Sequence, residues 1–397
     1  MNKRLLAVAV AGALAAPAAA FAQSSVTISG FFKGGFENSK LGSPSAARAG
    51  TRTSQYGVVD DSSRLIFNVV EDLGGGLQAI GQYDLRLKLD DTQGGAPASI
   101  AGGNTHVGLR SKTWGRLFFG RQDLHYFNRE SDLTTRGSLR ADSISILSYA
   151  GTGLVAVAGA TRTQNVIHYT TPNWGGFTMI AAYSSNPSAT DADIGTTIRR
   201  GRAWNLNPNY QGSNFQVGYS YWSSKPDGGI SAAAAAAFVA APTTANLTAL
   251  LAGADQRADR LYGSYTWGGF KVGLAWDRSK LKAVGPGGSA DIGNRTAWSL
   301  PLSYTWGAHS INAHFDRARR DKTLNGLGVN NTGANMFAVS YAYDLSKRTS
   351  AALTYARIKN QANASYNFFT GTSLGVSAAP NAGEDPRMWG VTLRHQF

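Results

Sequence analysis

Apolar and polar side chains alternate along many short segments of this chain. Between Leu77 and Asp90, every second position carries leucine, alanine, glycine or tyrosine, whereas the positions between them carry glutamine, aspartate, arginine and lysine, with Ile80 as the exception. Successive side chains of a β-strand point to opposite faces. This period of two therefore predicts strands with one face in an apolar environment and the other in a polar one.

Sixteen segments follow this rule. They cover residues 26–37, 62–72, 77–90, 104–111, 115–122, 164–171, 176–184, 201–210, 214–222, 258–266, 270–278, 295–304, 309–317, 336–344, 349–358 and 387–397. Most are close to the roughly 9–11 residues that a tilted strand needs to cross a membrane. An even number of antiparallel strands brings the end of the chain back to the side on which it began.

The connections between these segments are alternately short and long. Short turns such as 73–76 and 211–213 follow the even-numbered segments. Long connections follow the odd-numbered ones and cover residues 38–61, 91–103, 123–163, 185–200, 223–257, 279–294, 318–335 and 359–386. This is typical of outer-membrane barrels, which have short periplasmic turns and longer extracellular loops. A soluble two-sheet sandwich would also use alternating strands, but nothing in it would require this rule.

The dipeptide Trp-Gly recurs at short turns of the predicted fold. It begins at Trp114, Trp174, Trp267 and Trp306. An indole at such a turn would lie at the membrane interface, where one part of the ring is apolar and the other is wet. The four tryptophans are therefore predicted to lie on one rim.

Strands that cross a membrane must form a closed sheet, because unpaired backbone groups in hydrocarbon cost several kcal/mol each. A barrel of sixteen strands is too wide for side chains to fill and encloses a water-filled channel. The polar positions then line that channel, which accounts for charged residues such as Lys33, Arg86 and Arg394 within strands. The predicted fold is an all-β, 16-stranded antiparallel transmembrane β-barrel.

The composition agrees with such a fold and excludes several classes of chemistry. The chain has 47 glycines, 11% aromatic residues, 16% charged residues and no cysteine. Disulfides, thiolate catalysis and cysteine-based zinc sites are therefore excluded. The six histidines have no metal-ligand spacing and no recognisable hydrolase motif around them, so we predict no enzyme activity, catalytic residue, metal or cofactor. A structural or adhesion barrel would need apolar inward faces.

The first residues resemble a secretory signal. Lys3 and Arg4 precede an apolar run that leads to Ala20-Phe21-Ala22. We predict cleavage after Ala22 and a single barrel domain over residues 23–397; a membrane anchor would need a longer apolar run. Without Lys3 and Arg4, 36 basic and 24 acidic residues remain, a net charge of about +12. The charges are scattered and the chain is exported, so a nucleic-acid partner is not expected.

Several segments resemble the porins of Betaproteobacteria, of the Burkholderia, Comamonas and Bordetella type, within the Gram-negative general porin family. They are Ser63-Arg64-Leu65, Glu71-Asp72-Leu73-Gly74-Gly75-Gly76-Leu77, Phe119-Gly120-Arg121-Gln122, Tyr169-Thr170-Thr171-Pro172-Asn173-Trp174-Gly175-Gly176-Phe177, Tyr343-Asp344-Leu345-Ser346-Lys347-Arg348-Thr349 and the terminal Phe397. The resemblance spans the mature chain. It implies homotrimers whose third long loop folds inward to narrow the pore.

The resemblance also implies a wall of arginines that favours anions. Arg64 and Arg162 match two of its members, and both have the parity of inward positions. The third is missing, because Gly102-Gly103-Asn104 stands where it is expected. Arg110, which is inward by parity, is a candidate replacement, and Lys33 and Arg86 complete the predicted basic lining.

The third long connection, 123–163, is predicted to form the constriction. Its acids Glu130, Asp132 and Asp142 are expected to oppose the wall arginines and to create a transverse field that orients solutes. The alternative is that these charges pair within the loop or face bulk water.

The predicted function is passive diffusion of small hydrophilic solutes through the outer membrane, with a modest anion preference. The alternative is a saturable channel for one class of anionic solute, which would need a row of aromatic residues; Phe31, Trp222 and Tyr262 are too scattered for that. The expected partners are two further copies of the chain, the lipopolysaccharide and other lipid of the outer membrane, and the outer-membrane assembly machinery, which would recognise Phe397.

Overall fold

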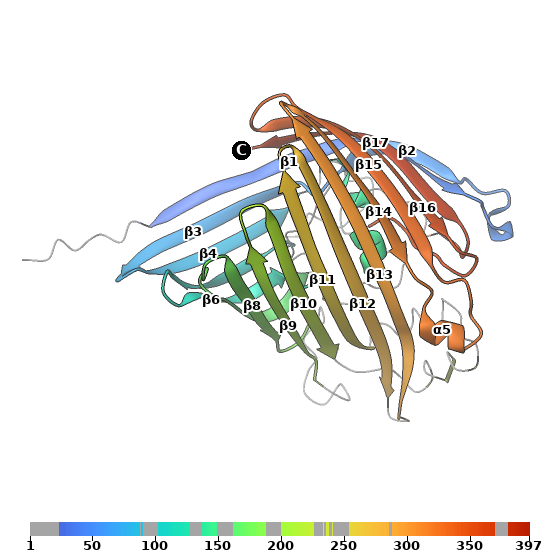
Figure 1. Ribbon diagram of the computed structural model, residues 1–397, viewed down its shortest axis with the longest axis horizontal. Helices are drawn as coiled ribbons and strands as arrows, with labels where there is room; N and C mark the ends of the chain where they lie inside the picture. The colour runs from blue at the N-terminus through green and yellow to red at the C-terminus, as the bar shows by residue number, and fades with distance from the viewer. Residues whose placement is uncertain are drawn as a thin grey trace, which may run out of the picture.

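The computed structural model describes residues 24–87, 89, 102–126, 137–148, 162–187, 200–225, 233, 236, 237, 240, 254–285, 288–369 and 380–397. Its strands form one antiparallel sheet that closes on itself, because the last strand pairs with the first (Figure 1). The strands are β1 (Ser25–Gly42), β2 (Ser54–Asp60), β3 (Arg64–Gly74), β4 (Leu77–Arg86), β5 (Thr105–Ser111), β6 (Gly115–Asp123), β7 (Arg162–Thr170), β8 (Phe177–Ser184), β9 (Arg202–Gln211), β10 (Phe215–Lys225), β11 (Asp255–Trp267), β12 (Phe270–Gly285), β13 (Gly288–Trp306), β14 (His309–Ala318), β15 (Ala334–Asp344), β16 (Thr349–Asn360) and β17 (Asp385–Gln396).

The predicted sixteen-stranded barrel is confirmed, although the described residues form seventeen strand segments. Both β2 and β3 pair with the same edge of β1, so they are two parts of one interrupted strand. The interruption has a local cause: the carboxylate of Asp60 accepts hydrogen bonds from the backbone N–H groups of Ser62 and Ser63. Ser62 has a positive φ of 70°, which turns the chain out of the ladder.

Two of the predicted long connections are partly wrong. Residues 38–61 include the end of β1 and all of β2, which pair with each other from Gly34–Asp60 to Lys40–Ser54. Residues 279–285 belong to β12 and residues 288–294 to β13, and their pairing continues out to Gly285 and Gly288. This hairpin extends past its neighbours in Figure 1. In both places the backbone groups continue to pair outside the membrane.

The barrel is apolar outside and polar inside, as the alternation predicts. Outward residues such as Val107 and Leu274 are 66% and 56% exposed, whereas inward polar residues such as Asn205 are buried. The four Trp-Gly turns lie on one rim, and each glycine after a tryptophan has a positive φ, between 53° and 95°. There, Trp267, Phe270, Tyr304 and Trp306 form a continuous row of rings 4.2–5.1 Å apart.

The helical elements are short and lie in connections. Those whose bounds the structure describes are the 3₁₀ turns η1 (Ala46–Arg48) and η2 (Leu139–Ala141) and the helices α2 (Ile144–Leu147) and α5 (Lys322–Gly326). None of the helices in the described part of the chain is long and apolar enough to span a membrane.

Candidate pore constriction

The third long connection folds into the barrel, as predicted. One described part of it, residues 137–148, touches the inner wall at three strands. The ammonium of Lys33 on β1 donates to the carbonyl of Gly137. On β16 the hydroxyl of Thr354 accepts from the N–H of Ser138 (3.1 Å), and on β14 Nε2 of His314 donates to a carbonyl in η2 (2.6 Å). Residues 137–148 are therefore held against the inner wall of the barrel.

A buried ion pair anchors the same connection to β1. Arg140, only 2% exposed, bonds to Glu37, and its guanidinium lies 5.7 Å from the ring of Phe368. A buried pair of this kind is strongly destabilising to break, because the remaining charge is left without a partner in a low-dielectric site. Breaking these contacts would strongly destabilise the fold, so they fix the position of residues 137–148.

The beginning of the third connection is anchored to other strands of the inner wall. Nδ1 of His125 lies 2.9 Å from the hydroxyl of Ser220 on β10, and the hydroxyl of Tyr126 lies 3.0 Å from that of Ser279 on β12. Burial lowers the pKa of His125 and raises that of Tyr126, so both are neutral near pH 7. Trp222, fully buried beside them, packs against this anchor and does not line the open channel.

A second connection also enters the lumen, which the sequence reasoning missed. Tyr366, Phe368 and Phe369, between β16 and β17, are all buried. The guanidinium of Arg295 donates to the hydroxyl of Tyr366 (2.6 Å), and the N–H of Phe369 donates to the hydroxyl of Ser145 in the third connection (2.8 Å). The cluster of aromatic residues at 366–369, unusual for an extracellular loop, was the available signal.

Arginines gather on the inner wall formed by β3, β4 and the neighbouring strands. Arg64 and Arg86 are directly opposite each other in the β3–β4 ladder, and both donate to the hydroxyl of Ser62 (3.2 and 2.9 Å). Asp84 accepts from Arg86 at 2.9 Å and lies 3.9 Å from Arg64. The two guanidiniums reach the lumen, with side chains 25% and 16% exposed, whereas that of Asp84 is only 2% exposed. The positive charge thus faces the channel.

Two further arginines complete this group. Arg162 lies 3.9 Å from Asp123 and donates to the carbonyl of Gly102 (3.2 Å). Arg121 is close enough to interact electrostatically with Arg86, Arg162 and Asp123. We define Arg64, Arg86, Arg121 and Arg162 as the arginine wall; with Asp84 and Asp123 as neighbouring acids, it carries a net positive charge.

Steric constraints explain why the expected third arginine is absent. A Cβ atom at Gly103 would lie 2.0 Å from Cγ of Asp84, so no side chain fits there without moving that carboxylate. Arg121 was missed because parity places it outward. The register between β6 and β7 shifts between Gly120 and Gln122, and a bulge of this kind changes the side on which the following residues lie.

Three other predicted lining residues, Arg110, Lys33 and Asp142, lie outside the arginine wall. Arg110 bonds to Gln78 (2.8 Å), eight positions from Arg86 along β4, and so lies outside the arginine wall. Lys33 is 8% exposed and pairs with Asp61 (2.7 Å), and it holds the third connection through the carbonyl of Gly137. Asp142 is buried and accepts from the N–H of Ile144 at the start of α2 (2.8 Å).

Two predicted residues cannot be placed on this wall. Glu130 and Asp132 lie outside the described residues. Among the residues that are described, no group of three His, Cys, Asp or Glu side chains is arranged to hold a metal ion.

Comparison with known proteins identifies the family. The profile of the Gram-negative porins matches residues 7–363, most of the chain. The chain belongs to the Gram-negative porin family. The porin is 27% identical to an outer membrane porin of Bordetella pertussis, over 88% of this chain and 92% of the relative. It is 28% identical to outer membrane porin protein 32 of Delftia acidovorans, over the full length of both.

Solved structures share the fold of this porin. The anion-selective porin from Comamonas acidovorans superposes with a TM-score of 0.73 at 22% identity, covering 94% of this chain and all of the other. The trimer form of OmpT from Vibrio cholerae gives a TM-score of 0.63 at 12% identity, covering 94% of this chain and 99% of the other. At these identities the likeness concerns the fold, and the porin's own side chains must account for its selectivity.

Proposed function

We propose that this outer-membrane porin lets small hydrophilic solutes diffuse passively, with a modest preference for anions. The arginine wall carries the proposal, because four guanidiniums gather on one side of the lumen and the nearer carboxylate, Asp84, is covered. A ring or wall of one charge sign selects the opposite ion in a channel. The solved Comamonas acidovorans protein, which has the same fold, is described as anion-selective.

The constriction would lie between the arginine wall and the third connection, 123–163. Residues 137–148 lie inside the barrel and are fixed to β1, β14 and β16, which would narrow the space available to a solute. The acids expected to oppose the wall are Glu130 and Asp132, since Asp142 is buried within the connection. Such an arrangement would order dipolar solutes in a transverse field, and no chemical step or energy source is required.

We further propose that the porin is exported through a Sec-type signal peptide, residues 1–22, and assembles as a homotrimer in contact with lipopolysaccharide. The trimer form of OmpT supports the assembly. Phe397 closes the barrel: it exchanges backbone hydrogen bonds with Gly30 (3.2 and 3.3 Å), and its ring packs against Phe32 at 5.3 Å. A terminal aromatic residue in this position is available to the assembly machinery before the barrel closes.

Single-channel recording in planar bilayers tests the proposal. We expect stable open channels whose conductance rises in proportion to salt concentration. A protein that inserts but does not conduct would refute the diffusion channel. Block at low concentration by one class of anion would instead establish the saturable channel.

A further inference from the structure

An aromatic ring interrupts the polar inner face of β1. Phe31 has the inward parity of Lys33 and Glu37, whereas its apolar neighbours Ile28 and Phe32 point outward and are 56% and 44% exposed. An inward side chain gains nothing from contact with lipid, so the hydrophobic effect that selects the outward residues does not explain this phenylalanine. Its contacts on the inner wall indicate its role.

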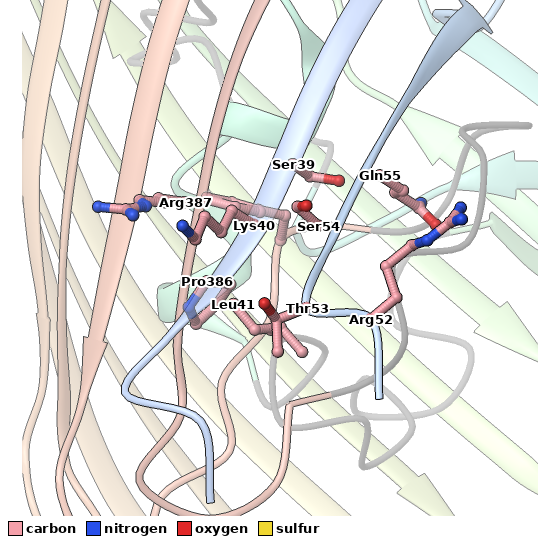
Figure 2. A pocket seen from close by; sticks show the side chains of 10 residues that line it. Ser39, Lys40, Leu41, Arg52, Thr53, Ser54, Gln55, Pro386 and Arg387 are labelled. Carbon is pink, nitrogen blue, oxygen red and sulfur yellow. The ribbon is translucent and has the colours of Figure 1, made fainter. Parts of the chain in front are cut away.

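Phe31 lies at the border of the covered part of β1. Toward the long connections, Lys33 and Glu37 are 8% and 4% exposed, because the third connection binds them. Ser39 and Leu41, each 6% exposed, line a recess where β1 ends (Figure 2). Phe31 itself is only partly buried. Its ring, and the groups that contact the ring, therefore lie next to the open lumen.

Two guanidiniums lie against the ring of Phe31, one from each neighbouring strand. That of Arg64 on β3 is 4.8 Å from the ring centre, and that of Arg394 on β17 is 4.6 Å from it. The two strands pair with opposite edges of β1. A cation within about 6 Å of an aromatic centre is attracted by the ring quadrupole. The ring thus connects Arg394 to the arginine wall.

The ring holds these cations without cancelling their charge. A carboxylate at the same position would also attract a guanidinium but would neutralise it, whereas a phenyl ring has no net charge. Nη1 of Arg64 lies 3.9 Å from Oδ2 of Asp84, which is longer than a hydrogen bond, although the same oxygen accepts from Arg86 at 2.9 Å. Arg64 is therefore held between the ring and the acid, without a direct bond to the acid.

We propose that Phe31 sets the strength of the anion preference by holding the guanidinium of Arg64 at the lumen and away from Asp84. Without the ring, Arg64 would close the remaining gap to this covered carboxylate, and the positive potential at the lumen would fall. Phe31 is thus a positioning residue, and Arg394 is a further charge that a passing anion meets. The inference rests on the anion preference proposed above.

Zero-current potentials across planar bilayers test this role. The test variant, Phe31→Leu, removes the ring and keeps an apolar side chain. Loss of a cation–π contact at a partly exposed site changes the distribution of a cation roughly two- to fivefold, so we expect the chloride-to-potassium permeability ratio to fall by about that factor. Phe31→Tyr keeps a ring and should restore the ratio. Only conducting channels are recorded, so a variant that folds poorly gives fewer channels and not a different ratio.

Phe118→Leu is the matched control. Phe118 also has inward parity, is fully buried and lies 5.0 Å from the guanidinium of Arg116. Arg116 is directly opposite Arg110 in the β5–β6 ladder, outside the arginine wall. This variant removes a contact of the same kind, and more packing, but should leave the permeability ratio unchanged. An equal fall in both variants would mean that the loss of a ring acts through the shape of the barrel, which would overturn the proposal.

A second background tests whether the ring acts through the acid. In Asp84→Asn the competing charge is gone, so adding Phe31→Leu should cause no further fall in the ratio. A further fall there would overturn the proposal, and so would a tyrosine at position 31 that lowers the ratio as much as leucine does. A cation preference of the unchanged porin would overturn the proposed function together with this inference. An anion preference that Phe31→Leu leaves intact would overturn this inference alone.

Discussion

Arg64 and Arg86 stand directly opposite each other on β3 and β4, and both donate to the hydroxyl of Ser62. Two like charges at such positions cost stability. Here the cost is reduced by Asp84, which lies behind them and is covered, so the positive charge still reaches the lumen. The pair is thus the centre of the arginine wall.

Removing a charge from this pair should weaken the anion preference. At about 5–8 Å in water, a unit charge changes the energy of a passing ion by roughly 0.5–0.8 kcal/mol. The change has opposite signs for chloride and potassium, so Arg64→Gln and Arg86→Gln should each lower the chloride-to-potassium permeability ratio roughly five- to fifteenfold, as measured from zero-current potentials. Arg110→Gln is the matched control, because eight strand positions, about 26 Å, exceed the Debye length of roughly 10 Å at 0.1 M salt. An equal effect of all three changes would contradict a localised wall.

A side chain at position 103 should displace Asp84, which lies behind the arginine wall. The Cβ of Gly103→Ala would lie 2.0 Å from Cγ of Asp84, so the carboxylate must shift away from Arg86. We expect a loss of about 1–3 kcal/mol in the free energy of unfolding, typical of overpacking, measured by urea titration of the folded barrel. Gly57→Ala is the control, since a Cβ there meets nothing within 4 Å. Equal stability of the two variants would show that Asp84 is free to move.

The ion pair between Arg140 and Glu37 should hold the third connection in the lumen. Arg140→Ala leaves Glu37 buried without its partner, and we expect a loss of roughly 3–5 kcal/mol in the free energy of unfolding together with noisier single-channel current. As the control, Arg257→Ala breaks the exposed ion pair with Asp259. The side chain of Arg257 is 58% exposed, so the free energy of unfolding should fall by less than about 1 kcal/mol. Quiet, unaltered current from Arg140→Ala would exclude this anchor.

Ser45 and Arg48 in one extracellular connection bond to Glu384 in another, and we call this contact the clasp. It should weaken in acid. Burial alone would raise the pKa of Glu384, but hydrogen bonds from the N–H groups of Ser45 and Asn381, from the Ser45 hydroxyl and from Arg48 lower it to about 2, against an ordinary value of 4.5. A lowered pKa adds stability that is complete above pH 4.5 and is lost as the pH falls toward 2.

Amide hydrogen exchange of residues 45–48 and 381–384, corrected for intrinsic rates, measures this clasp. Protection should be constant from pH 7 to 5 and should fall by pH 3, while the amides of β16 and β17 stay protected. Glu384→Gln should show roughly tenfold faster exchange at pH 7, consistent with the loss of charge-assisted bonds worth about 1.5 kcal/mol, and little further change in acid. Equal protection at pH 7 and pH 3 in the unchanged porin would rule out the clasp.

The sequence predicted the strands well because each strand separates two solvents. Lipid on one side and water on the other make apolar and polar residues alternate along both β4 and β17. This alternation can be recognised from the sequence without knowledge of tertiary contacts. The same argument fails where both faces are wet. The extension of β12 and β13 beyond the membrane, and β2 after the turn at Ser62, were therefore assigned to connections.

The constriction was predicted less completely, for physical reasons that differ from residue to residue. Arg64 and Arg162 follow from parity and from the family resemblance. Arg121 required the register shift on β6, which strict alternation does not reveal. Lys33 has inward parity but is covered by the third connection. Whether an inward residue is wet depends on how a loop folds over it, and that is set by long-range contacts.

The sign of the ion selectivity tests the central claim most directly. The zero-current potential of the porin is measured across a planar bilayer that separates 1 M from 0.1 M KCl. We predict the sign that corresponds to faster chloride passage, with a magnitude well below the roughly 59 mV of an ideally selective channel. A potential of the opposite sign would contradict an arginine wall that controls the pore.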